Sequence, residues 1–185
     1  MDTLVGEGRT SPINISRNDF GEPSSHRQPC VQVRPTRAAD RAAVLEMHAR
    51  CSRETRYSRW LGPSSHFPLT YLHSLLAGVP EHLAVVAVTD GQPERVIGLA
   101  SAAMTSDLWE LGILVEDRHQ AQGTGRLMLD SLMGLLDPNE PLYATSLSAN
   151  RWLLRKLARF GSVRISHDSG VSHAYVDRKA VRGGV

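Results

Sequence analysis

The stretch "VEDRHQAQGTGRLMLDSL" (115–132) sets Gly123 and Gly125 between a hydrophobic run and an amphipathic segment. From Arg126 onward, apolar side chains recur three and four residues apart, as on one face of a helix. Glycine has no Cβ, so the backbone at these positions can approach a ligand closely. The stretch therefore predicts a strand, a tight loop and a helix whose N-terminus offers free N–H groups and a partial positive charge.

Spacing excludes two phosphate-binding motifs at this loop. A P-loop requires Lys and then Ser or Thr after its last glycine, whereas Arg126 and Leu127 follow Gly125. A dinucleotide fingerprint requires a third small residue where Met128 stands. Two interpretations remain: a pyrophosphate cradle to which Arg118 and Arg126 add positive charge, or a turn that binds nothing.

Hydrophobic periods on both sides of the loop predict a mixed α/β domain. The passage through 108–147 reads as strand, helix and strand, which implies a parallel pair joined by a crossover. The hairpins around it make the expected central sheet mostly antiparallel, with about seven strands and flanking helices, and not doubly wound. Strands are expected at 31–35, 83–88, 95–104, 108–115, 142–147, 163–167 and 171–177, and helices at 36–52, 53–60, 69–78, 126–136 and 149–161.

The two ends of the chain differ from its middle. Residues 1–30 are polar and contain scattered glycines and prolines, so they lack the apolar surface that would offset the entropy of ordering. Residues 178–185 are basic and carry no hydrophobic period. We expect a flexible N-terminal arm over 1–30, one domain over 31–177 and a basic C-terminal tail over 178–185.

Composition excludes several classes of function. The formal net charge is only +2, and the arginines of "RWLLRKLAR" share their helix with an apolar stripe, so no nucleic-acid partner is expected. No apolar run approaches the ~18 residues of a membrane span, and the N-terminus lacks an export signal. The two cysteines make no disulfide framework, and no close set of His, Cys and Asp indicates a metal. We therefore expect a cytoplasmic protein with no metal and no membrane partner.

Four residues, from the end of the strand through the loop, form a recognisable pattern. Val115, Gln120, Gly123 and Gly125 fit V-x-x-x-x-[QR]-x-x-G-x-[GA], which resembles the acyl-CoA-binding signature of the GNAT superfamily (GCN5-related N-acetyltransferases). In that superfamily, an Asn after the next strand opens a helix that ends in Gly eleven residues later, and Asn150 and Gly161 keep this spacing. The resemblance covers roughly residues 31–177 and implies the acyl-CoA N-acyltransferase fold.

The resemblance implies a binding site for acetyl-CoA as co-substrate. The strand before the loop would separate from its neighbour at a bulge, so that pantetheine pairs with exposed backbone, and the loop amides would hold the pyrophosphate. Asn150 would contact the pantetheine arm, although it is also a good helix N-cap. The implied coenzyme-binding residues are Ile113, Leu114, Val115, Gln120, Ala121, Gln122, Gly123, Thr124, Gly125, Arg126 and Asn150.

The resemblance also implies a reaction, in which a primary amine of a protein lysine or a small molecule attacks acetyl-CoA directly in a ternary complex. Glu110 is the candidate catalytic base, since apolar neighbours on its strand would bury it and raise its pKa. The alternative is a Glu at the exposed end of the strand, paired with an arginine. Leu157 stands where many relatives carry the tyrosine that protonates the leaving thiolate. A non-catalytic acyl-CoA-binding sensor or regulatory module therefore remains the alternative function.

The segment "CSRETRYSRW" (51–60) bears on the acceptor. It resembles, more weakly, a stretch in the acetyltransferase domains of bacterial protein-lysine acetyltransferases. Glu54 would receive a cationic acceptor, with Tyr57 and Trp60 as walls, unless both aromatic residues belong to the core. Thr145 stands where N-terminal-peptide acetyltransferases often carry Glu, which counts against that subclass. Domains of this superfamily often dimerise, so a homodimer is among the expected assemblies.

Overall fold

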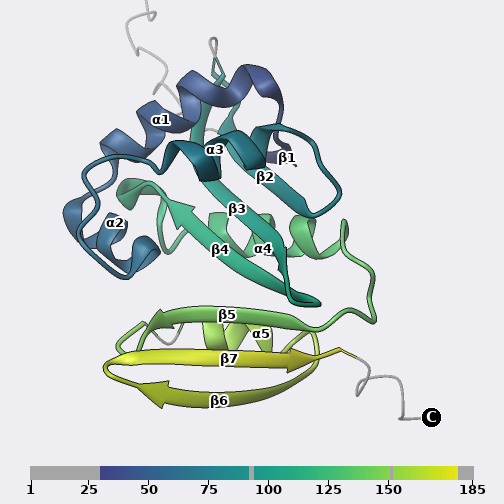
Figure 1. The fold of residues 1–185 in the computed structure, drawn as a ribbon. Coiled ribbons are helices and arrows are strands. Elements are labelled where there is room, and N and C mark those ends of the chain that lie inside the picture. Colours follow the sequence, from purple (N-terminus) through teal and green to yellow (C-terminus); the bar gives the residue numbers. More distant parts are fainter. Residues whose placement is uncertain (1–29, 92–93, 151, 179–185) are drawn as a thin grey trace, which may run out of the picture.

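The computed structural model describes residues 30–91, 94–150 and 152–178. Nearly all of the predicted arm over 1–30, and the predicted tail beyond residue 178, lie outside the described residues. The described chain forms one seven-stranded sheet in the order β1-β2-β3-β4-β5-β7-β6 (Figure 1). Its strands are β1 (Val31–Pro35), β2 (His82–Thr89), β3 (Arg95–Thr105), β4 (Leu108–Val115), β5 (Leu142–Leu147), β6 (Ser162–Asp168) and β7 (Val171–Asp177).

Strand pairing confirms the predicted sheet class. Strands β1 to β4 pair antiparallel with their neighbours in sequence, whereas β5 pairs antiparallel with β7, and β7 with β6. Among the strands of the described residues, only β4 and β5 pair in parallel, as a strand–helix–strand passage requires. The sheet is therefore mixed and mostly antiparallel.

Within the described part of the chain, five α-helices cover the two faces of the sheet (Figure 1). Helices α1 and α3 pack over β2 and β3 on one face, with α2 beside the end of β4, whereas α4 and α5 lie on the other face. Several predicted helix boundaries were wrong by two to five residues, and the two largest errors have a clear cause. Thr36 donates its backbone N–H to Ala84 and so extends the sheet, and α5 ends at Leu157 because tight turns complete the segment to Gly161. The helices are α1 (Arg41–Arg50), α2 (Arg53–Trp60), α3 (Leu69–Leu76), α4 (Thr124–Met133) and α5 (Trp152–Leu157).

Each face of the sheet has its own hydrophobic core. Side chains of β2 alternate between the two, with Val85 facing α4 and Val86 facing α1 and α3. This explains why β2 reads as a continuous apolar run, since both of its faces are covered. The helical periods are confirmed by burial of the predicted stripes: Val44, Met47 and Cys51 on and just after α1, and Leu129, Leu132, Met133 and Leu136 on and after α4.

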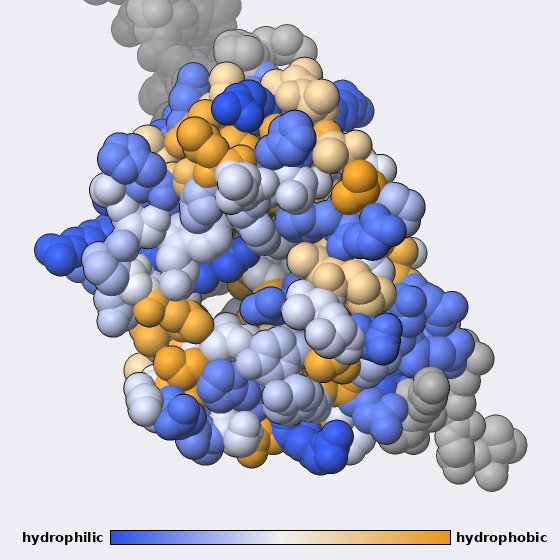
Figure 2. Space-filling view, viewed as in Figure 1, coloured by the Kyte–Doolittle hydropathy of each residue, from blue (hydrophilic) through white to orange (hydrophobic). Residues whose placement is uncertain are grey.

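Strands β4 and β5 stay paired for only part of their length. The parallel ladder joins Trp109–Leu111 to Leu142–Ala144 and stops there, so the strands separate from Gly112 onward. The expected bulge in β4 is wrong, because β4 pairs with β3 in one unbroken register and the register shift lies in β2 instead. The separation opens the molecule between its two halves, and Figure 2 shows the hollow on one face.

Candidate active site

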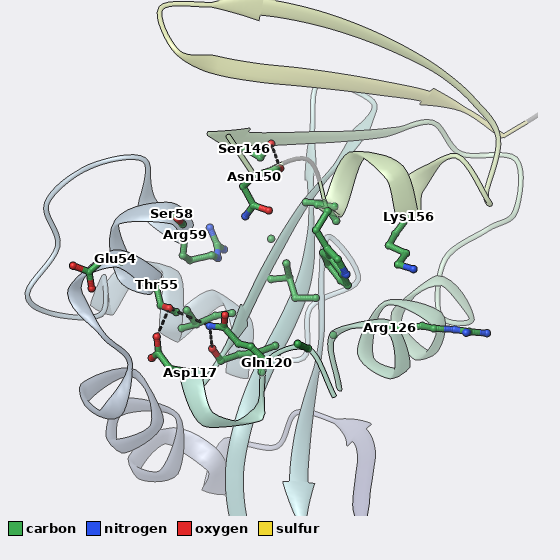
Figure 3. Close-up of a pocket in the computed structure, with 18 of the residues that line it drawn as sticks. Glu54, Thr55, Ser58, Arg59, Asp117, Gln120, Arg126, Ser146, Asn150 and Lys156 are labelled. Atoms are coloured by element: carbon green, nitrogen blue, oxygen red, sulfur yellow. Dashed lines mark hydrogen bonds between the residues drawn. The ribbon is translucent and has the colours of Figure 1, made fainter. Parts of the chain in front are cut away.

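A cavity of about 790 Å³ occupies the opening between β4 and β5 (Figure 3). Five parts of the chain contribute to its wall: α2, β4, the loop after β4, β5 and α5. Its lining residues are Ser52, Glu54, Thr55, Ser58, Arg59, Leu111, Gly112, Ile113, Leu114, Val115, Asp117, Gln120, Ala121, Gly123, Gly125, Arg126, Thr145, Ser146, Asn150, Trp152, Leu153 and Lys156.

The glycine loop reaches the cavity through two positions with different constraints. Gly123 has φ +89°, a backbone conformation that favours glycine, and it precedes the first residue of α4. A Cβ on Gly125 would lie 3.0 Å from the indole ring of Trp152, so Gly125 is small because α5 packs against it. The sequence indicated close approach of a ligand at both glycines, but it carried no signal for Trp152.

Gln120 ties the loop to two other elements. Its side-chain amide donates to the backbone carbonyl of Val115 at 2.9 Å and to Oγ1 of Thr55 at 3.1 Å. The amide of Gln122 donates to the carbonyl of Arg118 at 2.7 Å, which closes the loop on itself. The glutamine of the motif therefore holds the loop in shape and connects it to α2.

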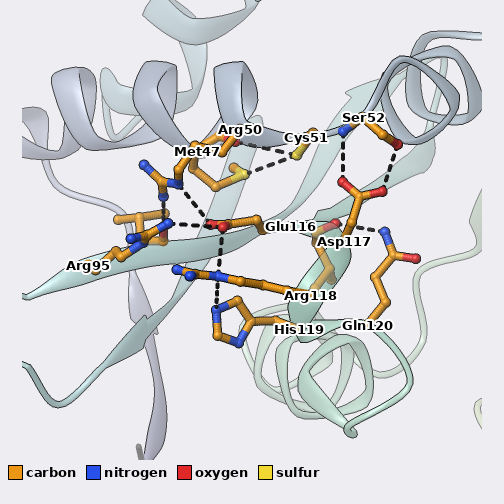
Figure 4. Close-up of polar contacts among 12 residues, drawn as sticks. Met47, Arg50, Cys51, Ser52, Arg95, Glu116, Asp117, Arg118, His119 and Gln120 are labelled. Carbon is orange, nitrogen blue, oxygen red and sulfur yellow. Dashed lines mark hydrogen bonds and ion pairs between the residues drawn. The ribbon is translucent and has the colours of Figure 1, made fainter.

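Asp117 fastens the loop to the start of α2 (Figure 4). Its carboxylate accepts the backbone N–H of Ser52 at 2.7 Å and the hydroxyls of Ser52 and Thr55 at 2.6 and 2.7 Å. Burial alone would raise the pKa of Asp117, but these hydrogen bonds hold it below its usual range. Two side chains of the loop, Asp117 and Gln120, thus share Thr55 as a partner.

Glu116 is buried beneath the loop and surrounded by arginines (Figure 4). Its carboxylate lies 2.9 Å from Arg50 Nε, 3.0 Å from Arg95 Nη2 and 2.9 Å from Arg118 Nε. Burial would raise the pKa of Glu116, but the three guanidinium groups lower it below its usual range. Arg118 is thus occupied by Glu116 and does not line the cavity, contrary to its predicted place beside the pyrophosphate.

Positive charge along the cavity comes from Arg59, Arg126 and Lys156. Arg126 is exposed and forms only a loose ion pair with Asp130, at 3.5 Å. Figure 3 shows Arg126 on α4 and Lys156 on α5 on the same side of the opening. Free N–H groups at the start of α4, together with these two cations, suit an anionic ligand such as a pyrophosphate.

Solved structures share this architecture. The GNAT domain of S. lividans PAT aligns with a TM-score of 0.67 and 20% identity, over 80% of this chain and 90% of that chain. A GNAT superfamily phosphinothricin acetyltransferase from Sinorhizobium meliloti, in complex with acetyl-CoA, aligns with a TM-score of 0.59 and 17% identity, over 83% and 92%. The chain has the fold of the GNAT acetyltransferases.

A third GNAT-fold match is the PaiA N-acetyltransferase from Thermoplasma acidophilum in complex with coenzyme A, with a TM-score of 0.54 and 12% identity, over 80% of this chain and 99% of that chain. No protein-family model matches the sequence, and no curated protein matches it at a significant level. The likeness to the GNAT fold is therefore a likeness of structure.

Most residues predicted to hold the coenzyme line the cavity between β4 and β5. Thr124 and Gln122 are the exceptions, because Thr124 is buried and neither residue lines the cavity. The predicted residues that do line it are Ile113, Leu114, Val115, Gln120, Ala121, Gly123, Gly125, Arg126 and Asn150.

Glu110 lies outside the cavity lining and is exposed. The alternation of β4 turns its neighbours Trp109 and Leu111 into the core under α4 and α5 and leaves Glu110 on the opposite face. The expectation that Glu110 is buried is therefore wrong, because its side chain lies on the face of β4 turned away from the core under α4 and α5. Its catalytic role stays a prediction.

The three predicted acceptor residues lie in three different environments: the cavity, the surface and the core. Glu54 lines the cavity, whereas Tyr57 and Trp60 do not. Tyr57 is exposed, and Trp60 packs edge-on against Phe67 and Tyr71. Arg59, between them, faces the cavity, and the sequence had assigned it no role.

Three further residues that the sequence singled out, Leu157 and two histidines, lie outside the cavity lining. Leu157, in place of the usual tyrosine, is fully buried in the core. His173 Nδ1 forms a hydrogen bond of 2.6 Å with the hydroxyl of Tyr143, and His167 Nδ1 forms one of 2.8 Å with the hydroxyl of Ser172.

Within residues 30–91, 94–150 and 152–178, no three His, Cys, Asp or Glu side chains are grouped as metal ligands. No helix in these ranges has both the length and the apolar character needed to cross a bilayer.

Proposed function

We propose that the chain belongs to the GNAT superfamily and is an N-acetyltransferase that moves an acetyl group from acetyl-CoA to a primary amine. The observation that carries the proposal is the cavity between β4 and β5, which ends at the glycine loop. A parallel strand that loses its partner leaves backbone groups unpaired, and these groups suit an extended arm with amides of its own. Two similar solved structures, those from Sinorhizobium meliloti and Thermoplasma acidophilum, are complexes with acetyl-CoA and coenzyme A.

The coenzyme is assigned along the cavity from strand to loop. Backbone of Ile113, Leu114 and Val115 pairs with the pantetheine arm, and Asn150 contacts it from the end of β5. The amides from Ala121 to Arg126 face the pyrophosphate, and Lys156 adds charge beside them. Gln120 acts indirectly, since its side chain is engaged with Val115 and Thr55.

The reaction is direct transfer in a ternary complex. The amine nitrogen attacks the thioester carbonyl carbon, the C–N bond forms, the C–S bond breaks and coenzyme A leaves as a thiolate. The proton of the amine passes to Glu110, directly or through water. Glu110 lies on β4 two residues before the point where β4 and β5 separate. Because Leu157 has no acidic proton, the thiolate leaves without a side-chain acid and takes its proton from solvent.

Two measurements test this function in sequence. Calorimetry should detect binding of coenzyme A, and thiol release from acetyl-CoA should follow the addition of primary amines. No uptake of coenzyme A at millimolar excess would contradict the proposal at its first step. Binding of coenzyme A without thiol release would contradict the transferase activity but would still support the coenzyme-binding site.

Glu110→Gln tests the assignment of the base. We expect turnover to fall by about 10²- to 10⁴-fold, the usual contribution of general base catalysis, with coenzyme A affinity unchanged. Glu46→Gln, an exposed glutamate on α1, is the matched control and should behave as the parent chain. Unchanged turnover of Glu110→Gln at neutral and mildly acidic pH would remove Glu110 from this role.

A non-catalytic acyl-CoA sensor of the same fold is the second candidate. Two observations favour it: Glu110 is outside the cavity lining, and the position of the usual general acid is a buried leucine, Leu157. Such a sensor would bind acetyl-CoA and release no thiol with any amine. The thiol-release assay therefore separates the two functions.

A further inference from the structure

Arg59 is a cation in the cavity wall that has no carboxylate partner among the described residues. It is half-buried on α2, and Figure 3 shows its guanidinium directed toward the centre of the opening, whereas Glu54 on the same helix points away. Six other arginines of the described chain are paired with acids, and one of them, Arg126, also lines the cavity: Arg34, Arg50, Arg95, Arg118, Arg126 and Arg159. A guanidinium placed in a ligand cavity without a counter-ion is suited to an anionic ligand.

The position of Arg59 is held by neutral neighbours. Its Nη2 donates to the hydroxyl of Tyr71 at 2.6 Å, and that hydroxyl also forms a hydrogen bond with Ser101. The guanidinium carbon lies 4.3 Å from the ring centroid of Trp60 and 5.3 Å from that of Tyr71. These contacts orient the group and leave its charge uncompensated, as a preorganised binding group requires.

Arg59 lies where β4 and β5 separate. A Cβ on Gly112 would overlap its guanidinium, so Arg59 rests directly on the first strand residue beyond the parallel ladder. The glycine loop begins after the other end of β4, beyond Val115, and β-strands rise about 3.3 Å per residue, so the phosphate end is about 10 Å away along the strand. Arg59 therefore serves the acyl end of the cavity and leaves the phosphates to the loop.

Chemistry at this end of the cavity suits a zwitterion. Glu110 lies on the same face of β4 as Gly112, about 7 Å away along the strand, and offers a negative charge for an ammonium group. The planar fork of Arg59 matches a carboxylate in a bidentate arrangement. A polyamine or a protein lysine brings positive charge without a carboxylate close to the amine, and Arg59 would repel it.

We propose that Arg59 binds the carboxylate of the acceptor, so that the acceptor is a free amino acid or another small amine that carries a carboxylate. This inference rests on the proposed transferase function and narrows its acceptor. It assigns Arg59 as a specificity-determining residue on α2.

The test compares free amino acids with the carboxamides of the same amino acids, which keep the amine and lose the negative charge. With saturating acetyl-CoA, the parent chain should use the free amino acids with about 10- to 100-fold higher kcat/KM, the range expected of hydrogen bonds to a charged group. Arg59→Gln should raise KM for the free acids by a similar factor and leave KM for the carboxamides unchanged. Arg53→Gln, an exposed arginine on the same helix, should match the parent chain.

Several outcomes would overturn the inference. Equal use of acids and carboxamides by the parent chain would do so, as would an equal loss of kcat with both acceptor classes in Arg59→Gln, which would place Arg59 at the reacting carbonyl. Thermal unfolding and coenzyme A affinity of Arg59→Gln should match the parent, which excludes misfolding as the cause.

Calorimetry of free amino acids with the coenzyme A complex separates this inference from the proposed function. Weaker binding to Arg59→Gln than to the parent chain would support the carboxylate site even where no thiol is released. If the coenzyme binds but no free amino acid does, the inference is wrong whatever the transfer assay shows.

Discussion

Glycine is needed at two positions of this chain for different structural reasons. A Cβ on Gly112 would overlap the guanidinium of Arg59, whereas a Cβ on Gly161 would overlap the backbone carbonyl of Asp177 at the end of β7. The end of an arginine side chain can move aside, but strand backbone cannot do so without disturbing its ladder. Gly112 therefore makes room for a cavity residue, and Gly161 allows the turn after α5 to pack against β7.

Alanine at these two glycines should have different effects, mainly on stability at Gly161 and mainly on the acceptor KM at Gly112. We expect Gly161→Ala to lower the free energy of unfolding by about 1–3 kcal/mol, the cost of overpacking. Gly112→Ala should cost no more than about 1 kcal/mol, the value of one hydrogen bond such as that from Arg59 to Tyr71, but should raise KM of the acceptor. Urea denaturation and initial rates measure the two effects. Equal losses of stability in both variants would contradict the assignment of Gly112.

The two cysteines should differ in reactivity. Cys51 is buried under α1, and this burial, together with the nearby carboxylates of Asp117 and Glu116, raises the pKa of its thiol to about 12. Cys30 is exposed. Because the thiolate is the reactive form, iodoacetamide at neutral pH should alkylate Cys30 and leave Cys51 unmodified until urea unfolds the chain, as mass spectrometry would show. Equal labelling of both thiols in the native protein would show that the burial of Cys51 is wrong.

At the scale of elements, the loop after β4 and helix α2 form one connected unit. Asp117 and Gln120 of the loop both bond to Thr55 of α2, and Asp117 also caps the backbone of Ser52. The loop is the proposed coenzyme site, and α2 carries Arg59, the proposed acceptor residue. The two halves of the site are therefore joined by side-chain hydrogen bonds as well as by the shared sheet.

Glu116 anchors this unit to the rest of the fold, and its loss should be costly. We expect Glu116→Gln to lower the free energy of unfolding by about 1–3 kcal/mol, since the buried position loses its charge-assisted hydrogen bonds to the guanidinium groups of Arg50, Arg95 and Arg118. Affinity for coenzyme A should fall with it, because the loop begins at Glu116. Urea denaturation and calorimetry measure both.

Asp130→Asn is the control for Glu116→Gln. Asp130 pairs with Arg126 and Arg159 at 3.5 and 3.3 Å, but its side chain is 38% exposed. Solvent screens such a pair, so its loss should change stability by less than about 1 kcal/mol. A loss in Glu116→Gln as small as in this control would mean that the buried arginine cluster does not stabilise the loop.

At the scale of the whole molecule, stability should fall as the pH drops below about 6.5. Burial lowers the pKa of His48 and of His82, and Arg59 lowers that of His82 further. Below the ordinary value of 6.5 the unfolded chain therefore takes up protons that the folded chain does not, and each such proton costs up to about 1.4 kcal/mol per pH unit. Glu116 and Asp117 have lowered pKa values, so their contribution to stability is present above the ordinary pKa range of carboxyl groups and is lost at more acidic pH.

Urea denaturation between about pH 7.5 and pH 5 measures this dependence. His48→Gln is the informative variant, because Gln can still accept the hydrogen bond that Trp60 Nε1 donates to His48 Nε2 at 3.1 Å, yet does not titrate. The slope of stability against pH should be smaller in this variant. An unchanged slope would remove His48 from the titration.

Local pattern was enough to predict the elements, the sheet class and the cavity-facing loop. Apolar periods determine which residues a strand or helix buries, and these periods are visible in any window of about a dozen residues. Where boundaries were wrong, local hydrogen bonds decided, as at Thr36, which joins the sheet, and at Phe160, whose N–H donates to Leu157 in a tight turn. Such choices depend on which backbone partner is available, which hydrophobicity does not encode.

By itself, the sequence of this protein determined the mixed sheet and the glycine loop at the end of β4, because both follow from residues close together in the chain. Only the tertiary structure decided that Glu110 is exposed, that Trp60 is packed into the core, and that Arg59 rests on Gly112 in the opening between β4 and β5. These outcomes depend on which surfaces meet across the sheet, and a residue's neighbours along the chain do not specify what packs against it from another element.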